Sequence, residues 1–168
     1  IDPSIGSINS IGESLTNIVW APLESGIKSI SLSANWMWPC GNEGEDSRLY
    51  DAVSACSRFA IELGINIPTG KDSLSMVQKY DSMKVKSPGT VIISASGHCE
   101  DIRKVVKPVL NKNIGDIYYI DMSFDELKLG GSSFAQTQNK IGTNAPTIKD
   151  SNKFKNAFTL VQDLIRAH

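Results

Sequence analysis

Two oxygen-bearing side chains, Glu13 and Asn17, stand four positions apart in the stretch GESLTNI. Apolar residues recur around them at helical spacing, so we expect a helix here. At about 100° per residue, the two side chains lie about 40° apart around the helix axis and one turn apart along it. Mg²⁺ prefers oxygen ligands and commonly takes only one or two of them from protein. This spacing is therefore compatible with a magnesium site.

Two structural interpretations compete with the metal site. Ser10 and Glu13 match the S-x-x-E capping box, in which Ser10 would begin a helix. However, the apolar periodicity extends back to Ile5, which places Ser10 inside the predicted helix. A Glu and an Asn at this spacing also occur on helix faces that simply meet water. From residue types and spacing alone, the solvated face is favoured over the metal site.

A second set of polar residues comprises Gly70, Lys71, Asp72 and Ser73. Glycine frees backbone amides and lysine supplies a positive charge, as in loops that bind phosphate. The P-loop pattern is nevertheless absent, because five residues separate Gly64 from Gly70 and Asp72 stands where Ser or Thr is required. We favour a turn between two short strands, with phosphate or substrate contact as the alternative.

The remaining polar candidates carry less chemistry. The glycines of LGGSS, residues 129–133, could offer amides to an anion, but plain loop chemistry is favoured. Cys40, Cys56 and Cys99 are odd in number, widely spaced and outside any C-x-x-C pattern, so we expect free thiols and no zinc site. We assign no catalytic residue, because the sequence places no nucleophile near His98 or His168.

Hydrophobic periodicity and turn residues predict the elements that would position these side chains. We expect helices over residues 4–19, 46–63, 100–110, 129–140 and 151–168, with Asp46 and Ser151 as caps, Gly64 as a terminator and a break near Pro108. We expect strands over residues 29–34, 66–69, 74–79, 90–96 and 117–122, and a loop through WMWPCGNEGED that could mark an interface. The alternation of strands and helices predicts an α/β or α+β fold.

The overall composition excludes several classes of partner. Lys and Arg total 17 against 18 Asp and Glu, giving a net charge of −1, so a nucleic-acid partner is not expected. No apolar run approaches the roughly 20 residues that span a bilayer, and the first residues lack a signal peptide's pattern. We therefore expect a cytoplasmic protein without a membrane partner. The chain lacks an initiator Met and stops inside a predicted helix, so we expect an excised segment of a longer protein.

Four sequence blocks, taken together and in order, resemble one enzyme family. They are GESLTNI, LSANWMWPCGNEGEDSRLYDAV, IPTGKDSLSM and VKSPGTVIISASGHCEDIRK. These blocks are similar to those of the large, single-chain phosphoribosylformylglycinamidine synthases, across about residues 12–136. The likeness is weaker from residue 139 onward.

The resemblance implies a place within that family's architecture. Proteins of that family resemble two aminoimidazole-ribonucleotide-synthetase-like units in tandem, and this chain looks like part of the second unit. Residues 1–100 would be the later part of its N-terminal subdomain, and residues 101–168 the opening of its C-terminal subdomain. A shift toward Lys and Pro over residues 100–113 agrees with that boundary. The implied fold is a mixed sheet with helices on one face, followed by the start of a second α/β subdomain.

The resemblance also implies a reaction and cofactors. The family is a ligase of de novo purine biosynthesis, which uses ATP and glutamine to convert formylglycinamide ribonucleotide to its amidine. In the family, the Glu and Asn of the GE-x-LTN helix bind Mg²⁺ beside ATP or ADP, which implies a metal site at Glu13 and Asn17 in an auxiliary nucleotide site. Gly70, Lys71, Asp72 and Ser73 match the family's GKDS block, which suggests contact with nucleotide or substrate.

Other features of the family are absent from these residues. The glutaminase domain with its Cys nucleophile and the glycine-rich ATP segment would lie elsewhere in the same polypeptide, so we expect the isolated chain to be inactive. Two alternatives remain: a non-catalytic nucleotide-binding structural module, or a related synthetase or kinase of the same superfold. Exposed strand edges would also favour a homodimer of the isolated chain.

Overall fold

The computed structural model describes residues 1–110, 112 and 115–167. Its α-helices are α1 (Pro3–Ile18), α2 (Glu45–Leu63), α3 (Ser133–Thr137) and α4 (Ser151–Ala167), and its 3₁₀ helices are η1 (Gly26–Ser29) and η2 (Ile102–Lys104). Its strands are β1 (Ser31–Met37), β2 (Asn66–Ser73), β3 (Val77–Lys79), β4 (Lys84–Lys86) and β5 (Thr90–Ser96). His168 and residues 111 and 113 of the predicted subdomain boundary lie outside the described residues.

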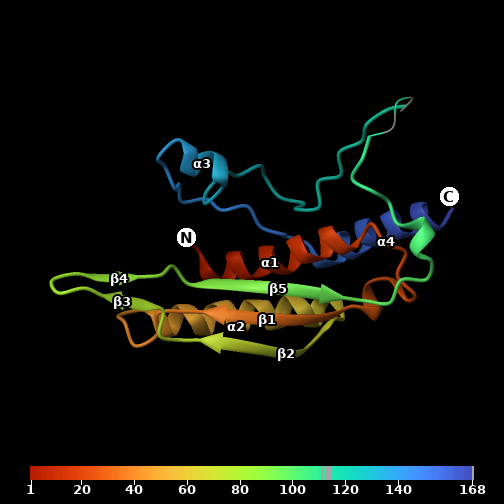
Figure 1. The fold of residues 1–168 in the computed structure, drawn as a ribbon. Coiled ribbons are helices and arrows are strands. Elements are labelled where there is room, and N and C mark those ends of the chain that lie inside the picture. The colour runs from red at the N-terminus through yellow and green to blue at the C-terminus, as the bar shows by residue number, and fades with distance from the viewer. Residues whose placement is uncertain (111, 113–114, 168) are drawn as a thin grey trace.

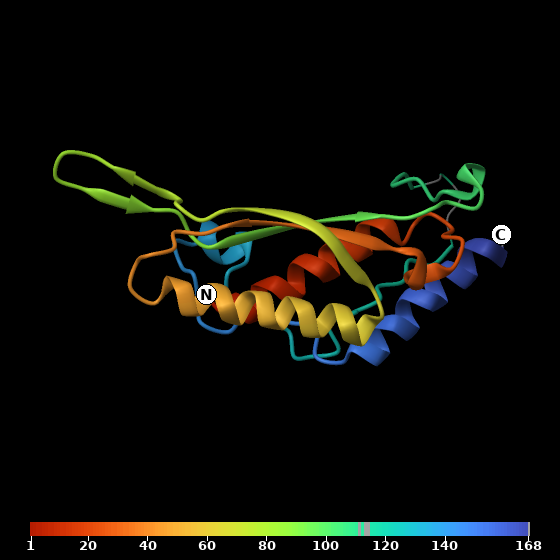
Figure 2. The ribbon, with the colours of Figure 1, turned by 90° about the horizontal axis from the view of Figure 1, so that it is seen from below.

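The central sheet has three strands in the order β2-β1-β5. Strand β1 runs parallel to β2 and antiparallel to β5, so the sheet is mixed. Helices α1, α2 and α4 lie on the same side of this sheet, and the β3–β4 hairpin extends away from it (Figures 1 and 2). The predicted fold class, a mixed α/β fold with helices on one face, is confirmed.

A single core lies between the sheet and the three long helices. Along β1, Leu32 and Ala34 are buried while Ser31, Ser33 and Asn35 are only half-buried, which is the alternation expected of a strand covered on one face. Helix α4 joins the same core through Phe158, and the Phe154 ring meets the Phe59 ring of α2 edge to face at 6.2 Å. Residues 151–165 therefore share their core with the first hundred residues.

Two of the predicted helix caps are wrong, and the predicted terminator is confirmed. Helix α2 begins after Gly44, whose φ of 78° favours glycine, and the Asp46 carboxylate instead accepts a hydrogen bond from the Gly41 amide at 2.9 Å. At the start of α4, the carboxylate of Asp150, not Ser151, accepts hydrogen bonds from the next backbone amides. Gly64 ends α2 with a φ of 75°.

Several predicted elements differ from the observed ones. The sequence predicts a strand over residues 117–122, but the structure has none there, because this apolar run is largely exposed and pairs with no strand among the described residues. The predicted helix over 100–110 is only the short η2, and that over 129–140 shortens to α3. The predicted loop begins later than expected, because β1 continues through Trp36 and Met37.

Candidate functional site

Helix α1 carries the first candidate pair, and both the cap at its start and its buried face determine how this helix is placed. Pro3 stands at the start of the helix, and the Asp2 carboxylate accepts a hydrogen bond from the Ile5 amide at 3.0 Å. Ile11 and Leu15 are fully buried in the core, so the opposite face of α1 must meet solvent. This packing turns Glu13 and Asn17 outward.

Glu13 and Asn17 are both exposed on α1, one helical turn apart. Within the described residues, neither side chain makes a hydrogen bond or an ion pair, so their oxygens are available to a ligand. A carboxylate and a carboxamide are both hard oxygen donors of the kind that Mg²⁺ takes. The residues present therefore fit a magnesium ion that completes its shell with other oxygens.

The capping-box interpretation of Glu13 is wrong. Helix α1 begins at Pro3, so Ser10 lies in its interior. The Ser10 hydroxyl contacts the Gly6 carbonyl at 3.0 Å and the Val91 carbonyl of β5 at 3.3 Å. Ser10 therefore ties the helix to the sheet and does not begin it.

Asn17 stands in the last turn of α1, next to an open cavity of about 780 Å³. The carbonyl end of a helix carries a negative partial charge, which favours a cation nearby. The cavity is mostly apolar and is lined by Trp20, which is 48% exposed, and by residues 105–110 of the segment after β5. This end of α1 thus combines a cation-favouring helix terminus with an apolar hollow.

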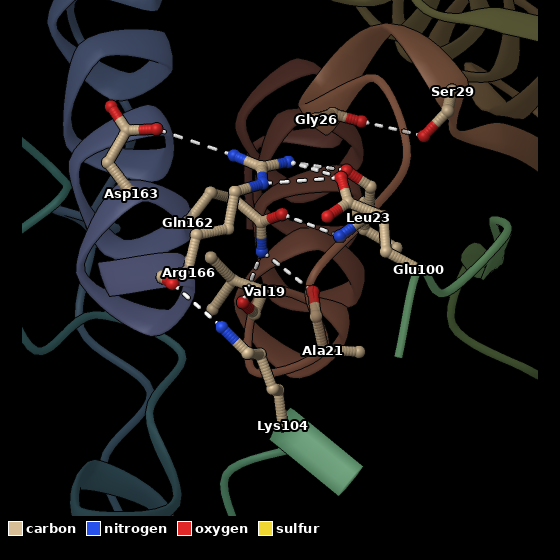
Figure 3. Close-up of polar contacts among 10 residues, drawn as sticks. All are labelled: Val19, Ala21, Leu23, Gly26, Ser29, Glu100, Lys104, Gln162, Asp163 and Arg166. Carbon is tan, nitrogen blue, oxygen red and sulfur yellow. Dashed lines mark hydrogen bonds and ion pairs between the residues drawn. The ribbon is translucent and has the colours of Figure 1, made fainter. Parts of the chain in front are cut away.

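The turn that follows α1 is held by buried polar contacts from α4 (Figure 3). The Gln162 carboxamide donates to the carbonyls of Val19 at 2.6 Å and Ala21 at 2.8 Å, and accepts from the Leu23 amide at 2.8 Å. Gln162 itself is 1% exposed. Sequence reasoning missed this residue, although Gln162 stands one helical turn after Phe158 on the apolar face of the predicted helix, and a polar residue at that position could have drawn attention to it.

A second contact from α4 joins the same turn to the segment after β5. The Arg166 guanidinium donates to the Leu23 carbonyl and to the Glu100 carboxylate, the latter at 3.1 Å (Figure 3). The Lys104 ammonium donates to the Arg166 carbonyl at 2.8 Å. Three separate parts of the chain therefore meet at the end of α1.

The second candidate set, residues 70–73, lies in β2 and not in a turn. The predicted turn is wrong because these residues pair in register with β1, Gly70 opposite Ala34 and Lys71 opposite Asn35. The Lys71 ammonium donates to the Ser73 hydroxyl at 3.1 Å. Strand β2 forms one edge of the sheet, whereas α1 packs against β5 at the other edge (Figure 1). The structure therefore does not bring residues 70–73 together with Glu13 and Asn17.

The weaker candidates acquire structural explanations. The Ser132 hydroxyl accepts from the Ala135 amide at 3.1 Å, so it caps α3, and the Gly130 amide donates to the Asn144 carbonyl. Cys40, Cys56 and Cys99 are free thiols, as predicted. No cluster of three or more His, Cys, Asp or Glu side chains suited to a metal occurs in the described part of the chain.

The segment before α3 contains the carboxylate with the largest pKa shift. Asp125 is 3% exposed and pairs with the ammonium groups of Lys128 at 2.5 Å and Lys149 at 3.3 Å. The hydrogen bond from Lys128 is the main cause that lowers the Asp125 pKa from 3.8 to about 2. This cluster anchors residues 121–128 to the residues just before α4.

Fold and site together define a class of protein: a mixed α/β domain that presents a helix with two oxygen donors beside its sheet. Residues 1–98 match the family model described as the FGAR-AT PurM_N-like domain. The chain belongs to this family.

Two curated relatives extend the similarity over nearly the whole chain. The chain is 42% identical over 167 residues to the probable phosphoribosylformylglycinamidine synthase, chloroplastic/mitochondrial, of Arabidopsis thaliana. It is 39% identical over 168 residues to the probable phosphoribosylformylglycinamidine synthase of Caenorhabditis elegans. Each alignment covers 98% of this chain but only 12% and 13% of the respective relative. None of the described helices is long and apolar enough to cross a membrane.

Proposed function

We propose that this chain is part of an ATP- and glutamine-dependent phosphoribosylformylglycinamidine synthase, a carbon–nitrogen ligase of purine biosynthesis. The observation that carries the proposal is identity of about 40% along 98% of the chain with two synthases, together with the family match. The whole reaction converts an amide carbonyl to an amidine, using ammonia released from glutamine and cleavage of ATP to ADP and phosphate. Because the chain spans only 12% of the Arabidopsis relative, we expect it to be inactive by itself.

Within that enzyme, we propose that Glu13 and Asn17 hold Mg²⁺ beside ATP or ADP at an auxiliary nucleotide site. Bound Mg²⁺ would neutralise phosphate charge. The chain's own contribution is to present two unengaged oxygen donors from adjacent turns of a helix that packs against β5. We assign no proton transfer or nucleophile to these residues.

Gly70, Lys71, Asp72 and Ser73 are proposed as a separate contact for nucleotide or substrate, because the Lys71 ammonium is exposed on an edge strand.

We further propose the arrangement of the chain within the enzyme. It would belong to the second synthetase-like unit, with residues 1–100 in the N-terminal subdomain and 101–168 opening the C-terminal one. The glutaminase domain would belong to the same polypeptide, and the enzyme would act in the cytoplasm. The outer edges of β2 and β5 could pair with a second copy, which would give a homodimer of the isolated chain.

The metal site is tested by Glu13→Gln and Asn17→Ala in the whole gene product that carries these residues. Binding of ADP is titrated by calorimetry at increasing Mg²⁺ concentrations. Both variants should raise the Mg²⁺ concentration needed for half-maximal binding. Glu13→Gln removes the negative charge and one oxygen of the carboxylate, and Asn17→Ala removes the carboxamide oxygen. Matched controls are Glu62→Gln on α2 and Asn156→Ala on α4, two exposed helical positions that should leave binding unchanged. The same Mg²⁺ dependence in the parent protein, the two site variants and the two control variants would refute the proposed metal site.

The same variants separate a turnover site from a structural one. If the nucleotide only stabilises the fold, Asn17→Ala should lower the melting temperature of the ADP-loaded enzyme and reduce activity only in proportion to unfolding. Unchanged thermal stability and assembly, combined with lost glutamine-dependent amidine formation, would contradict the structural role. The two roles are therefore distinguished by measuring activity and melting temperature on the same samples.

A further inference from the structure

We propose that Gln162 of α4 is a positioning residue that fixes the end of α1 from which Asn17 projects. This inference rests on the proposed metal site at Glu13 and Asn17. Gln162 lies 145 positions after Asn17 in the chain, yet its carboxamide bonds directly to the backbone beginning two residues beyond Asn17. It touches neither candidate ligand and would act only through the backbone of the turn.

The hydrogen bonds of Gln162 are placed where α1 has lost its own. The last carbonyls of a helix have no partner inside the helix and must be satisfied from outside. One N–H of the Gln162 carboxamide donates to the carbonyl of Val19, the residue that caps the end of α1, and the other donates to the carbonyl of Ala21 in the turn beyond it. The carboxamide oxygen accepts from the Leu23 amide. One side chain therefore fixes three alternate residues of the turn at distances of 2.6 to 2.8 Å.

Filling of space alone does not explain a carboxamide at this position. A buried amide is costly unless its hydrogen bonds are made, and an apolar residue of similar volume would fill the same space without that cost. The neighbouring inward positions of α4, Val161 and Ile165, are apolar and buried. What Gln162 adds beyond burial is a fixed geometry for the turn.

The turn is also held from its other side, by backbone hydrogen bonds to the residues that follow β5. The Trp20 carbonyl accepts from the Val106 amide at 2.9 Å, and the Glu24 amide donates to the His98 carbonyl at 3.1 Å. Without Gln162, the carbonyls of Val19 and Ala21 would lose their hydrogen-bond donor. The turn would then be held only by its remaining contacts, including those of Trp20 and Glu24 with the segment after β5. The last turn of α1, and Asn17 with it, would then shift or fray.

A supporting residue of this kind affects metal affinity through ligand placement. Loss of groups that orient metal ligands typically weakens metal binding about 10- to 100-fold. Because Gln162 acts through two residues of backbone, we expect the lower end of that range. The proposal therefore predicts that removing the carboxamide raises the Mg²⁺ requirement for nucleotide binding by about tenfold.

The test uses Gln162→Met in the whole gene product, with ADP as the nucleotide and Mg²⁺ as the titrant. Methionine keeps the volume and removes all three hydrogen bonds. The control is Gln138→Met, an exposed glutamine just after α3. We expect the half-saturating Mg²⁺ concentration to rise about tenfold for Gln162→Met and to stay unchanged for Gln138→Met. A folded Gln162→Met protein with the original Mg²⁺ dependence overturns the proposal.

A double variant separates positioning from general stability. If Gln162 acts through Asn17, then Gln162→Met should add little to the Mg²⁺ requirement once Asn17→Ala is present, whereas a general loss of stability would add its full effect. Additive effects overturn the inference while leaving the metal site intact. If Asn17→Ala itself does not change the Mg²⁺ dependence, the proposed function and this inference both fail.

A second variant keeps the test available if Gln162→Met does not fold. Arg166 binds the same turn at the Leu23 carbonyl, and its side chain is 32% exposed, so its replacement by Met disturbs the core less. Arg166→Met should also raise the half-saturating Mg²⁺ concentration, by a smaller factor. The original Mg²⁺ dependence in folded Arg166→Met would show that the turn does not control the site, and would overturn the proposal.

Discussion

Gly70 lies so close to Ala34 that a Cβ atom built on Gly70 would stand 2.3 Å from the Ala34 carbonyl oxygen. The obstacle is backbone of the paired strand β1, which no side-chain rotation can move aside. The glycine of the GKDS block is therefore required for the pairing of β2 with β1, whatever else the block does. This relationship separates a structural role for Gly70 from the proposed ligand contact of Lys71.

Gly70→Ala should destabilise the chain by about 1–3 kcal/mol, because the added methyl group must push two paired strands apart. Urea unfolding followed by circular dichroism measures the change. The control is Gly6→Ala in α1, where a Cβ would meet no atom within 4 Å. There alanine should stabilise the helix by about 0.5–1 kcal/mol. Equal stability of Gly70→Ala and the parent chain would contradict the close strand contact.

Phe158→Ala should cost about 3–5 kcal/mol of unfolding free energy, because this ring is 0% exposed and its loss leaves a cavity in the shared core. Leu160→Ala, at a position of α4 that is 53% exposed, should change stability by less than about 0.5 kcal/mol. Chemical denaturation of both variants measures the difference. A small effect of Phe158→Ala would mean that α4 folds apart from the first hundred residues.

The sequence predicted those elements whose signals are local. Periodic Ile11 and Leu15 located α1, and Gly64 located the end of α2, because periodicity and a left-handed terminator act within a few residues. By contrast, the strand predicted at 117–122 failed because strand formation depends on a partner elsewhere in the chain. The position of Gly70 in a strand was missed for the same reason, since the pairing partner is β1.

The candidate site was predictable only in part. The spacing of Glu13 and Asn17 on one helix face follows from the sequence, and the structure places both outward. The contribution of Gln162 was not predictable, because its partners lie about 140 residues earlier and are backbone groups without a sequence signature. Periodicity finds the face of a helix, whereas the contacts that hold its end depend on tertiary structure.

Cys56 should be the least reactive of the three thiols. It is 2% exposed, and burial raises its pKa to about 11. At pH 8, only about 0.1% of such a thiol is the reactive thiolate. We expect iodoacetamide, followed by mass spectrometry of peptides, to label Cys99 in the folded chain and Cys56 only after unfolding in urea. Equal labelling of Cys56 and Cys99 in the folded chain would contradict its burial.

Acid should weaken the fold through Asp125. Its pKa is about 2 in the folded chain against 3.8 when unperturbed, so the folded state binds this proton less readily than the unfolded state. The ion pairs with Lys128 and Lys149 therefore stabilise the fold fully above about pH 4, and their contribution is lost as the pH falls from 3.8 toward 2.

Asp125→Asn removes that titrating group and should separate its contribution from general acid denaturation. We expect the variant to unfold at a lower urea concentration than the parent chain at pH 7, and the difference in urea midpoint to narrow as the pH falls to about 2.5. Below pH 3.8 the unfolded parent takes up a proton on Asp125, which removes most of the stabilisation that the ion pairs provide. Asp51→Asn is the control, because Asp51 is exposed on α2 and has no ion-pair partner among the residues that the structure describes. Parallel urea midpoints for Asp125→Asn and the parent across this pH range would show that the pairing of Asp125 does not stabilise the fold.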